Sequence, residues 1–144
     1  MQFFHKDLLE TDEYFDVLLV IDVFEHVPDY VGFVQRCRQK ARYKIYHIPL
    51  DLHVSSALRD SFMNARLSVG HLHYFSQRTA LATLTDTGHE IIDIMLTPGA
   101  IELFRMHPSI KRAAANVPRM IVGSFNPSLS ARLFGGYSFL VLTQ

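Results

Sequence analysis

The stretch that decides the fold is residues 14–29, Y-F-D-V-L-L-V-I-D-V-F-E-H-V-P-D. Residues 17–21 form a continuous apolar run between Asp16 and Asp22. Because this run does not alternate with polar residues, it predicts a strand covered on both faces, as in a parallel sheet. Asp29 predicts the N-cap of the next helix, since its carboxylate accepts a backbone N–H of the first turn.

Outward from this stretch, the pattern predicts that helices alternate with strands. The expected elements are helices over residues 30–42, 55–66 and 77–87 and strands over residues 44–48, 90–96 and 137–142. Ser76 is expected to cap the third helix, and Gly88 is expected to end it. The alternation predicts an α/β fold, in which ligands bind beyond the carboxyl ends of the strands. That edge would carry residues 22–26 and 49–51.

Composition narrows the classes of protein. The 144 residues include 14 Lys plus Arg and 14 Asp plus Glu, so the formal net charge is zero, which argues against a nucleic-acid partner. Cys37 is the single cysteine, so no intrachain disulfide forms, which fits a cytoplasmic location. The N-terminus has no signal-peptide pattern, and its apolar run is too short to span a membrane, so we expect no transmembrane segment.

Three segments carry a resemblance to a known family. Residues 14–29 closely resemble the fourth-strand segment of class I S-adenosylmethionine-dependent methyltransferases, in which F-D precedes a buried strand and D-V-x-E-H-V-x-D opens a helix. Residues 70–76, G-H-L-H-Y-F-S, resemble the family segment before a later helix, and residues 3–8 resemble the end of its third strand. The resemblance implies S-adenosylmethionine as cofactor and methyl transfer to a small-molecule acceptor.

The same resemblance implies a partial Rossmann-like methyltransferase fold. The sheet would be mostly parallel, with an antiparallel C-terminal strand over residues 137–142 between the strands over residues 44–48 and 90–96. The family's glycine-rich loop and ribose-binding acid normally precede the point where this chain starts. We therefore expect residues 1–144 to form a single methyltransferase-like domain that lacks the N-terminal cofactor-loop half, with residues 97–136 inserted between the last two strands.

The missing loop has two expected consequences. Binding of S-adenosylmethionine should be weak or absent, because glycines in that loop let the backbone approach the cofactor closely. The strand over residues 17–21 should have an unpaired edge, which we expect to be covered by residues 2–5, by the insertion or by a second copy of the chain. If it is covered, Leu19→Lys should be strongly destabilising.

The resemblance also implies a cofactor side and a substrate side. Asp7 would accept a hydrogen bond from the adenine amino group, Leu8 would pack on the ring, and Ile21 and Asp22 would lie beside the transferred methyl. The alternatives are a solvated turn acid for Asp7 and a helix-stabilising acid for Asp22.

His26 is the candidate catalytic residue, because an imidazole titrating near neutral pH can take the proton of an acceptor hydroxyl. Glu25 would orient His26, and His71 would line the substrate side. The alternative for His26 is a structural role at the start of the helix.

The sequence predicts no metal site. His71 and His73 would face the same side of an extended segment, and His47 and His53 are candidates to join them, but no cysteine or carboxylate stands at ligand spacing. Two hypotheses about function are favoured over a histidine-based metal protein. The first is a methyltransferase, impaired or incomplete in this chain; the second is a non-catalytic remnant that binds a partner or self-associates through the open sheet edge.

Overall fold

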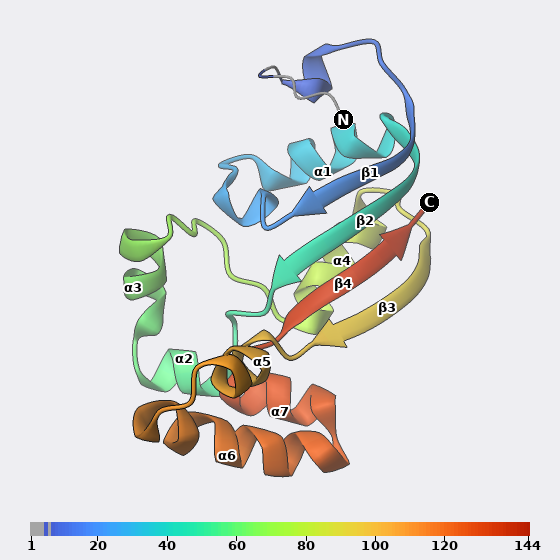
Figure 1. Ribbon diagram of the computed structural model, residues 1–144. Coiled ribbons are helices and arrows are strands. Elements are labelled where there is room, and N and C mark those ends of the chain that lie inside the picture. The colour runs from blue at the N-terminus through green and yellow to red at the C-terminus, as the bar shows by residue number, and fades with distance from the viewer. Residues whose placement is uncertain (1–4, 6) are drawn as a thin grey trace.

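The apolar run of residues 17–21 lies in a strand, as predicted, in the computed structural model, which describes residue 5 and residues 7–144 (Figure 1). In chain order the elements are η1 (Leu8–Glu10), β1 (Phe15–Ile21), η2 (Phe24–His26), α1 (Tyr30–Arg38), β2 (Ala41–Pro49), α2 (Val54–Leu58), α3 (Ser61–Ser68), α4 (Gln77–Asp86), β3 (Ile91–Thr97), α5 (Gly99–Met106), α6 (Ile110–Phe125), α7 (Pro127–Phe134) and β4 (Ser138–Thr143). No helix among these described elements has the length and apolar character that crossing a membrane requires.

The four strands form one sheet in the order β1-β2-β4-β3. β1 and β2 are parallel, with Leu19 opposite Ile45, whereas β4 is antiparallel to both β2 and β3. Three strands therefore share one direction, and the C-terminal strand runs against them. This arrangement confirms the α/β class, the partial Rossmann-like methyltransferase fold and the predicted place of the last strand.

Local capping explains where two of the helices begin and end. The Asp29 carboxylate accepts the Gly32 N–H at 2.9 Å and starts α1. Ser76 and Thr79 form a capping box at the start of α4, in which each side chain accepts the other's backbone N–H. Gly88, with a φ of +85°, follows that helix in the left-handed conformation that glycine adopts without strain. These signals are local, and the sequence predicted them correctly.

Two predicted helices end differently in the structure. The helix expected over residues 30–42 stops at Arg38, and Ala41 starts β2 opposite Phe15 of β1. Residues 41 and 42, which fit the side-chain pattern of the helix, therefore belong to β2, which pairs with β1. The helix expected over residues 55–66 is broken into α2 and α3 by Asp60, whose φ of +48° is left-handed. Side-chain periodicity does not reveal either break, because both are set by backbone contacts and conformation.

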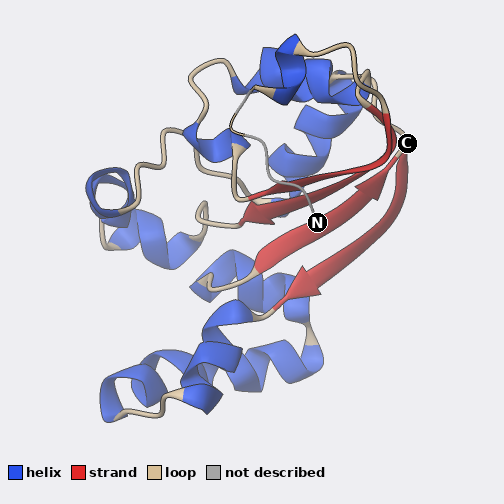
Figure 2. Ribbon diagram, turned by 45° about the horizontal axis from the view of Figure 1, so that its top comes forward, coloured by secondary structure: helices blue, strands red, loops and turns tan. Residues whose placement is uncertain are grey.

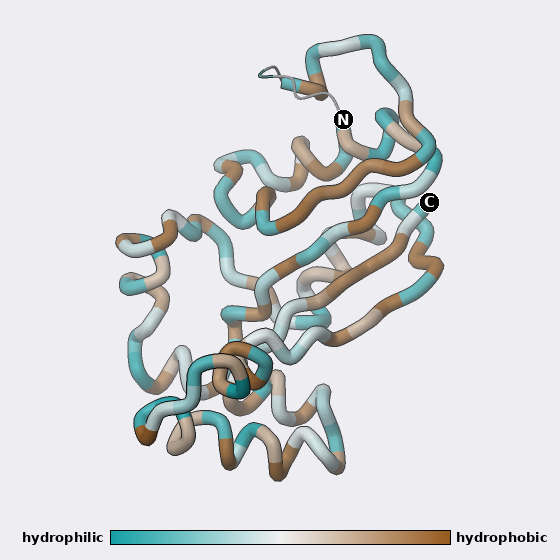
Figure 3. The backbone as a smooth tube through the Cα atoms, in the orientation of Figure 1, coloured by the Kyte–Doolittle hydropathy of each residue, from teal (hydrophilic) through white to brown (hydrophobic). Residues whose placement is uncertain are grey.

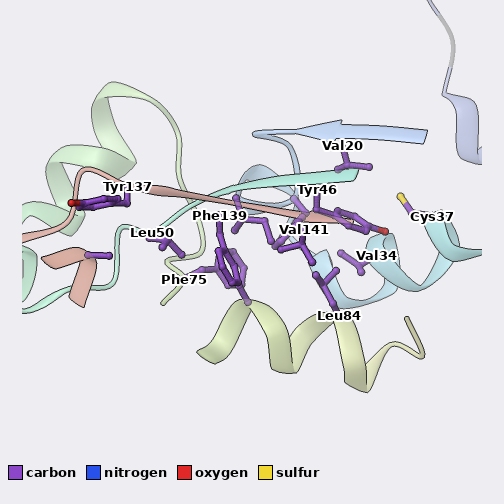
Figure 4. Packing of buried hydrophobic residues seen from close by; sticks show 14 of the residues in the cluster. Val20, Val34, Cys37, Tyr46, Leu50, Phe75, Leu84, Tyr137, Phe139 and Val141 are labelled. Atoms are coloured by element: carbon purple, nitrogen blue, oxygen red, sulfur yellow. The ribbon is translucent and has the colours of Figure 1, made fainter. Parts of the chain in front are cut away.

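The core lies on one face of the sheet, under α1 and α4 (Figure 4). Val20, Tyr46 and Val141 project from β1, β2 and β4 and meet Val34 of α1 and Leu84 of α4, all of them buried. Burial of such side chains supplies most of the stability of a small domain. Figure 2 shows the helices gathered on one side of the strands and beyond one end of them.

The opposite face of the sheet is bare, so the prediction that both faces of β1 are covered is wrong for the described part of the chain. Val17, Leu19 and Ile21 are exposed, Leu19 by 61%. Figure 3 shows most of β1, residues 17–21, as a hydrophobic segment. Residues 97–136, one of the expected covers, lie in helices beyond the end of the sheet instead (Figure 1). The other expected intramolecular cover, residues 2–5, lies outside the described residues except for His5.

The segment between β3 and β4 forms α5, α6 and α7. The buried guanidinium of Arg119 in α6 donates to the carbonyl oxygens of Gly135 at 2.6 Å and Phe134 at 3.0 Å. It thereby joins α6 to the end of α7, where the chain turns into β4. On the other side α7 packs against α2, so this segment closes the end of the sheet at which β2 stops.

Candidate functional site

The carboxyl ends of β1 and β2 bring an acid and a histidine together. Ile21 is opposite His47 in the parallel register, and the next residue, Asp22, has a left-handed φ of +49°. That turn places Asp22 Oδ1 2.7 Å from His47 Nδ1. A left-handed conformation in a residue other than glycine is rare and strained, and such strain gathers at functional sites. The edge predicted for ligand binding is therefore polar and conformationally constrained.

The short helix η2 follows this turn and buries Glu25 completely. The backbone carbonyl of Glu25 accepts N–H groups from Leu72 at 2.8 Å and His73 at 3.1 Å. These two bonds hold the segment around His71 against η2, although the segments are separated by more than 40 residues in the chain. The two parts of the family resemblance, residues 14–29 and 70–76, thus form one site.

His26 and His71 face each other in this site. Their rings meet edge to face, with centroids 4.9 Å apart. His26 Nδ1 lies 3.1 Å from the Gly70 carbonyl oxygen, and His71 Nδ1 lies 2.6 Å from Asp51 Oδ2. Each imidazole therefore donates through Nδ1 and keeps Nε2 as an acceptor. His26 Nε2 is 3.8 Å from Glu25 Oε1, which is too far for a hydrogen bond.

The Glu25 carboxylate is the unusual group of the site. Neither of its oxygens has a hydrogen-bond partner among the described residues, although the side chain is fully buried. Burial raises the pKa of Glu25, and the nearby charge of Asp22 raises it further. Buried carboxylates are normally paired, so a buried carboxylate without a partner marks a candidate functional group.

The histidines do not group as the sequence analysis proposed for a metal. His73 packs on Tyr30 and places Nε2 3.0 Å from the Val27 carbonyl oxygen. His47 pairs with Asp22, and His53 caps α2 by accepting the Ser56 N–H at 3.1 Å. The structure therefore joins His71 to His26 and Glu25, and not to His73, His47 or His53.

The predicted cofactor side is divided between two places. Ile21 and Asp22 end β1, next to η2 and the start of α1. Asp7 caps η1 by accepting the Leu9 N–H at 2.9 Å, and its charge acts on the Cys37 thiol near the end of α1. Leu8, in the same short helix, is partly buried. The structure thus brings Ile21 and Asp22 to the site but leaves Asp7 and Leu8 near the other end of α1.

Two contributors to the site were not identified from the sequence, namely Asp51 and His47 as the partners of His71 and Asp22. The only sequence signal was their place at the carboxyl end of the second strand, where Asp51 lies within the segment 49–51 and His47 shortly before it. Hollows of the surface also lie away from this site. A pocket of about 570 Å³ lies between α2, the start of α4 and α7, with Leu52, His53 and Leu129 in its lining.

No protein-family model matches the chain, and no curated protein matches it in sequence. Solved structures do match it. An S-adenosylmethionine-dependent methyltransferase from Archaeoglobus fulgidus is similar to it with a TM-score of 0.55 and 16% identity, over 96% of this chain and 65% of that one. Magnesium protoporphyrin IX methyltransferase from Synechocystis PCC 6803, with bound S-adenosylhomocysteine, gives 0.53 and 11% over 96% of this chain and 48% of that one.

A third similar structure is phosphoethanolamine N-methyltransferase 2 from Haemonchus contortus in complex with S-adenosylmethionine. Its TM-score is 0.51 at 14% identity, over 95% of this chain and 35% of that one. The chain therefore spans between about a third and two thirds of the length of these three proteins. At these identities the likeness concerns the fold, which agrees with the strand order and with the resemblance of residues 14–29 and 70–76. The chain has a class I methyltransferase-like fold.

Proposed function

We propose that the chain forms the acceptor side of a methyltransferase, at which a small molecule receives a methyl group from S-adenosylmethionine. The observation that carries this proposal is the structural likeness to methyltransferases along 96% of the chain. It is supported by the position of Asp22, Glu25, His26 and His71 at the carboxyl ends of β1 and β2, where α/β folds bind ligands.

The described residues do not form a complete site for S-adenosylmethionine. Asp7 and Leu8 lie near the far end of α1 from Ile21 and Asp22, and the Asp22 carboxylate already contacts His47. No glycine-rich loop is present to bring the backbone close to a cofactor. We therefore expect this chain alone to bind the cofactor weakly, and full binding to need further polypeptide.

On the acceptor side, His26 is the group placed to take a proton. Its Nδ1–H is held by the Gly70 carbonyl, so Nε2 is the free basic nitrogen. The ring is partly exposed, which lets an acceptor hydroxyl approach it. Removing that proton as the oxygen becomes methylated is the expected contribution of His26.

Nuclear magnetic resonance on the 144-residue chain tests the cofactor side of this proposal. Millimolar S-adenosylhomocysteine should shift the backbone amide signals of Ile21 and Asp22 and leave that of Leu129, in the pocket beside α7, unchanged. Calorimetry should show binding weaker than about 1 µM, which corresponds to about −8 kcal/mol. Shifts of the Leu129 signal without shifts of Ile21 and Asp22 would refute the proposal, and binding tighter than about 1 µM would refute the expectation of an incomplete site.

The bare face of the sheet supports a second function, association with a second copy of this chain. Val17, Leu19 and Ile21 form an exposed apolar row on the edge strand β1, and such edges pair readily with other chains. In that case light scattering should give twice the mass of one chain, and Leu19→Lys should return it to the mass of one. A single-chain mass at all concentrations up to 100 µM would exclude this second function.

A further inference from the structure

We propose that Glu25, His26 and His71 form a binding site for one divalent transition-metal ion. The site lies where η2 meets the segment around His71, and it uses two imidazole nitrogens and one carboxylate oxygen. This inference goes beyond methyl transfer and does not depend on cofactor binding, because the ligands all belong to the described chain.

The first observation is the convergence of the three side chains. One nitrogen from each imidazole and one Glu25 oxygen lie within 4.8 Å of one another. The Glu25 Oε1 to His26 Nε2 distance is 3.8 Å. Ligands of a tetrahedral ion with bonds near 2.0 Å stand about 3.3 Å apart, so closing the site takes only a small side-chain movement. The partly exposed ring of His26 leaves a way in for the ion.

The second observation is the hydrogen bonding behind the two imidazoles. Asp51 Oδ2 lies 2.6 Å from His71 Nδ1, and the Gly70 carbonyl oxygen lies 3.1 Å from His26 Nδ1. Metal-binding histidines are typically held in this way, with the nitrogen that does not bind the metal donating to a carboxylate or a backbone carbonyl. Both partners fix the tautomer that leaves Nε2 unprotonated, which is the form that binds a metal.

The third observation is independent of geometry and concerns the buried charge. Glu25 is fully buried, and within residues 7–144 neither carboxylate oxygen has a hydrogen-bond partner. A buried carboxylate without a partner is costly, and a cation bound to it removes that cost.

The ligand types indicate the class of ion. Two imidazoles and one carboxylate suit Zn²⁺ or Fe²⁺, whereas Mg²⁺ and Ca²⁺ prefer oxygen ligands. Three protein ligands leave at least one position open, as in catalytic metal sites. With an ion bound, His26 Nε2 becomes a ligand and can no longer take a proton. If the proposed function also holds, an acceptor hydroxyl bound at the open position would lose its proton more easily through the charge of the ion.

The test uses the untagged 144-residue chain, freed of metal with a chelator, and ZnCl₂ as the probe in isothermal titration calorimetry. We expect one Zn²⁺ per chain. Glu25→Gln and His71→Gln each remove a ligand and should weaken the affinity by more than about 100-fold, and Asp51→Asn should weaken it by about 10- to 100-fold through His71. His107→Gln, which removes an exposed histidine far from the cluster in sequence, should leave the affinity unchanged.

Melting temperatures distinguish a variant that has lost a metal ligand from a variant that has lost its folded structure. Zn²⁺ should raise the melting temperature of the unsubstituted chain and of His107→Gln, because a ligand of the folded state stabilises it, and should not raise that of Glu25→Gln. All variants are measured with and without chelator. If Glu25→Gln or His71→Gln is unfolded under both conditions, Asp51→Asn, which retains all three ligands, is used in its place to measure the loss of affinity. Absence of a one-to-one titration would overturn the proposal, and so would an affinity of Glu25→Gln and His71→Gln equal to that of the unsubstituted chain.

Discussion

The two faces of the sheet are built from the same kinds of residue but differ in what surrounds them. On the face under α1 and α4, Val20, Tyr46 and Val141 are almost completely buried. On the other face, Val17 and Leu19 of β1 are exposed, and no described helix or strand lies over them. The difference shows that an apolar residue in a strand predicts burial of that position. It does not show whether another segment of the same chain packs over it.

Neighbouring residues of one strand make this comparison sharp. Val20 is 3% exposed and Leu19 is 61% exposed, because successive side chains of a strand point to opposite faces. Substitution of each by the same charged residue therefore compares the two faces at almost the same place in the chain. The predictions below follow from this comparison, beginning with the largest expected effect.

Val20→Lys should unfold the protein or come close to doing so. The lysine would replace a side chain packed against the core that α1 and α4 form with the sheet, where a charge has no partner. The cost should be several kcal/mol, which is comparable to the whole stability of a small domain, about 5–15 kcal/mol. Urea unfolding followed by circular dichroism measures it. A folded Val20→Lys variant of unchanged stability would contradict the assignment of this face to the core.

The covered face should also make stability depend on pH, through His89. The ring is buried, with Nε2 2.8 Å from Tyr46 Oη and Nδ1 3.1 Å from Thr87 Oγ1. Burial and, to a smaller extent, the charge of Lys44 together lower the pKa of His89 to about 4. The unfolded chain, with a pKa near 6.5, then binds more protons than the folded chain between pH 6.5 and 4, so stability falls as pH falls through that window.

The loss from His89 should amount to about 3 kcal/mol, and it is absent above pH 6.5. Urea unfolding at pH 7.5, 5.5 and 4.5 measures it, with His89→Gln as the comparison. Glu25, whose pKa is raised by burial, acts in the opposite direction, but it is present in both proteins. The difference between their slopes therefore reports His89. Equal slopes would show that His89 is not the buried neutral base described here.

Leu19→Lys should have the smallest effect, within about 0.5 kcal/mol, because the lysine points into water from the bare face. The measurement is the same urea unfolding as for Val20→Lys, at low protein concentration. A loss of several kcal/mol would show that something covers this face in solution. If that loss depends on protein concentration, the cover is a second copy of the chain.

The candidate site shows how far the sequence reaches. Glu25, His26 and His71 were identified through the resemblance of two short segments, and the structure brings all three together. The partners Asp51 and His47 were not predicted as partners, because their contacts join residues 20 and 25 positions apart. Whether Asp7 and Leu8 contribute to a cofactor site stays a prediction.

The sequence by itself determined the local structure of this protein. The apolar run of residues 17–21, the caps at Asp29 and Ser76, and Gly88 after α4 act through neighbours a few residues away, so their effects are visible in the pattern of residue types. The resemblance then supplied the order of the strands. The same apolar run also predicted that both faces of β1 are covered. Whether a face is covered depends on which polypeptide packs against it, and the run does not show this.

Only the tertiary structure decided which polar groups meet and which are left without partners. His71 pairs with Asp51 and faces His26 because two backbone bonds dock its segment on η2. The same docking leaves the Glu25 carboxylate buried, with no hydrogen-bond partner in the part of the chain that the structure describes. Such contacts depend on the relative placement of separate elements to within an ångström or two, and hydrogen bonding changes steeply over that distance. Residue patterns along the chain do not carry information of that precision.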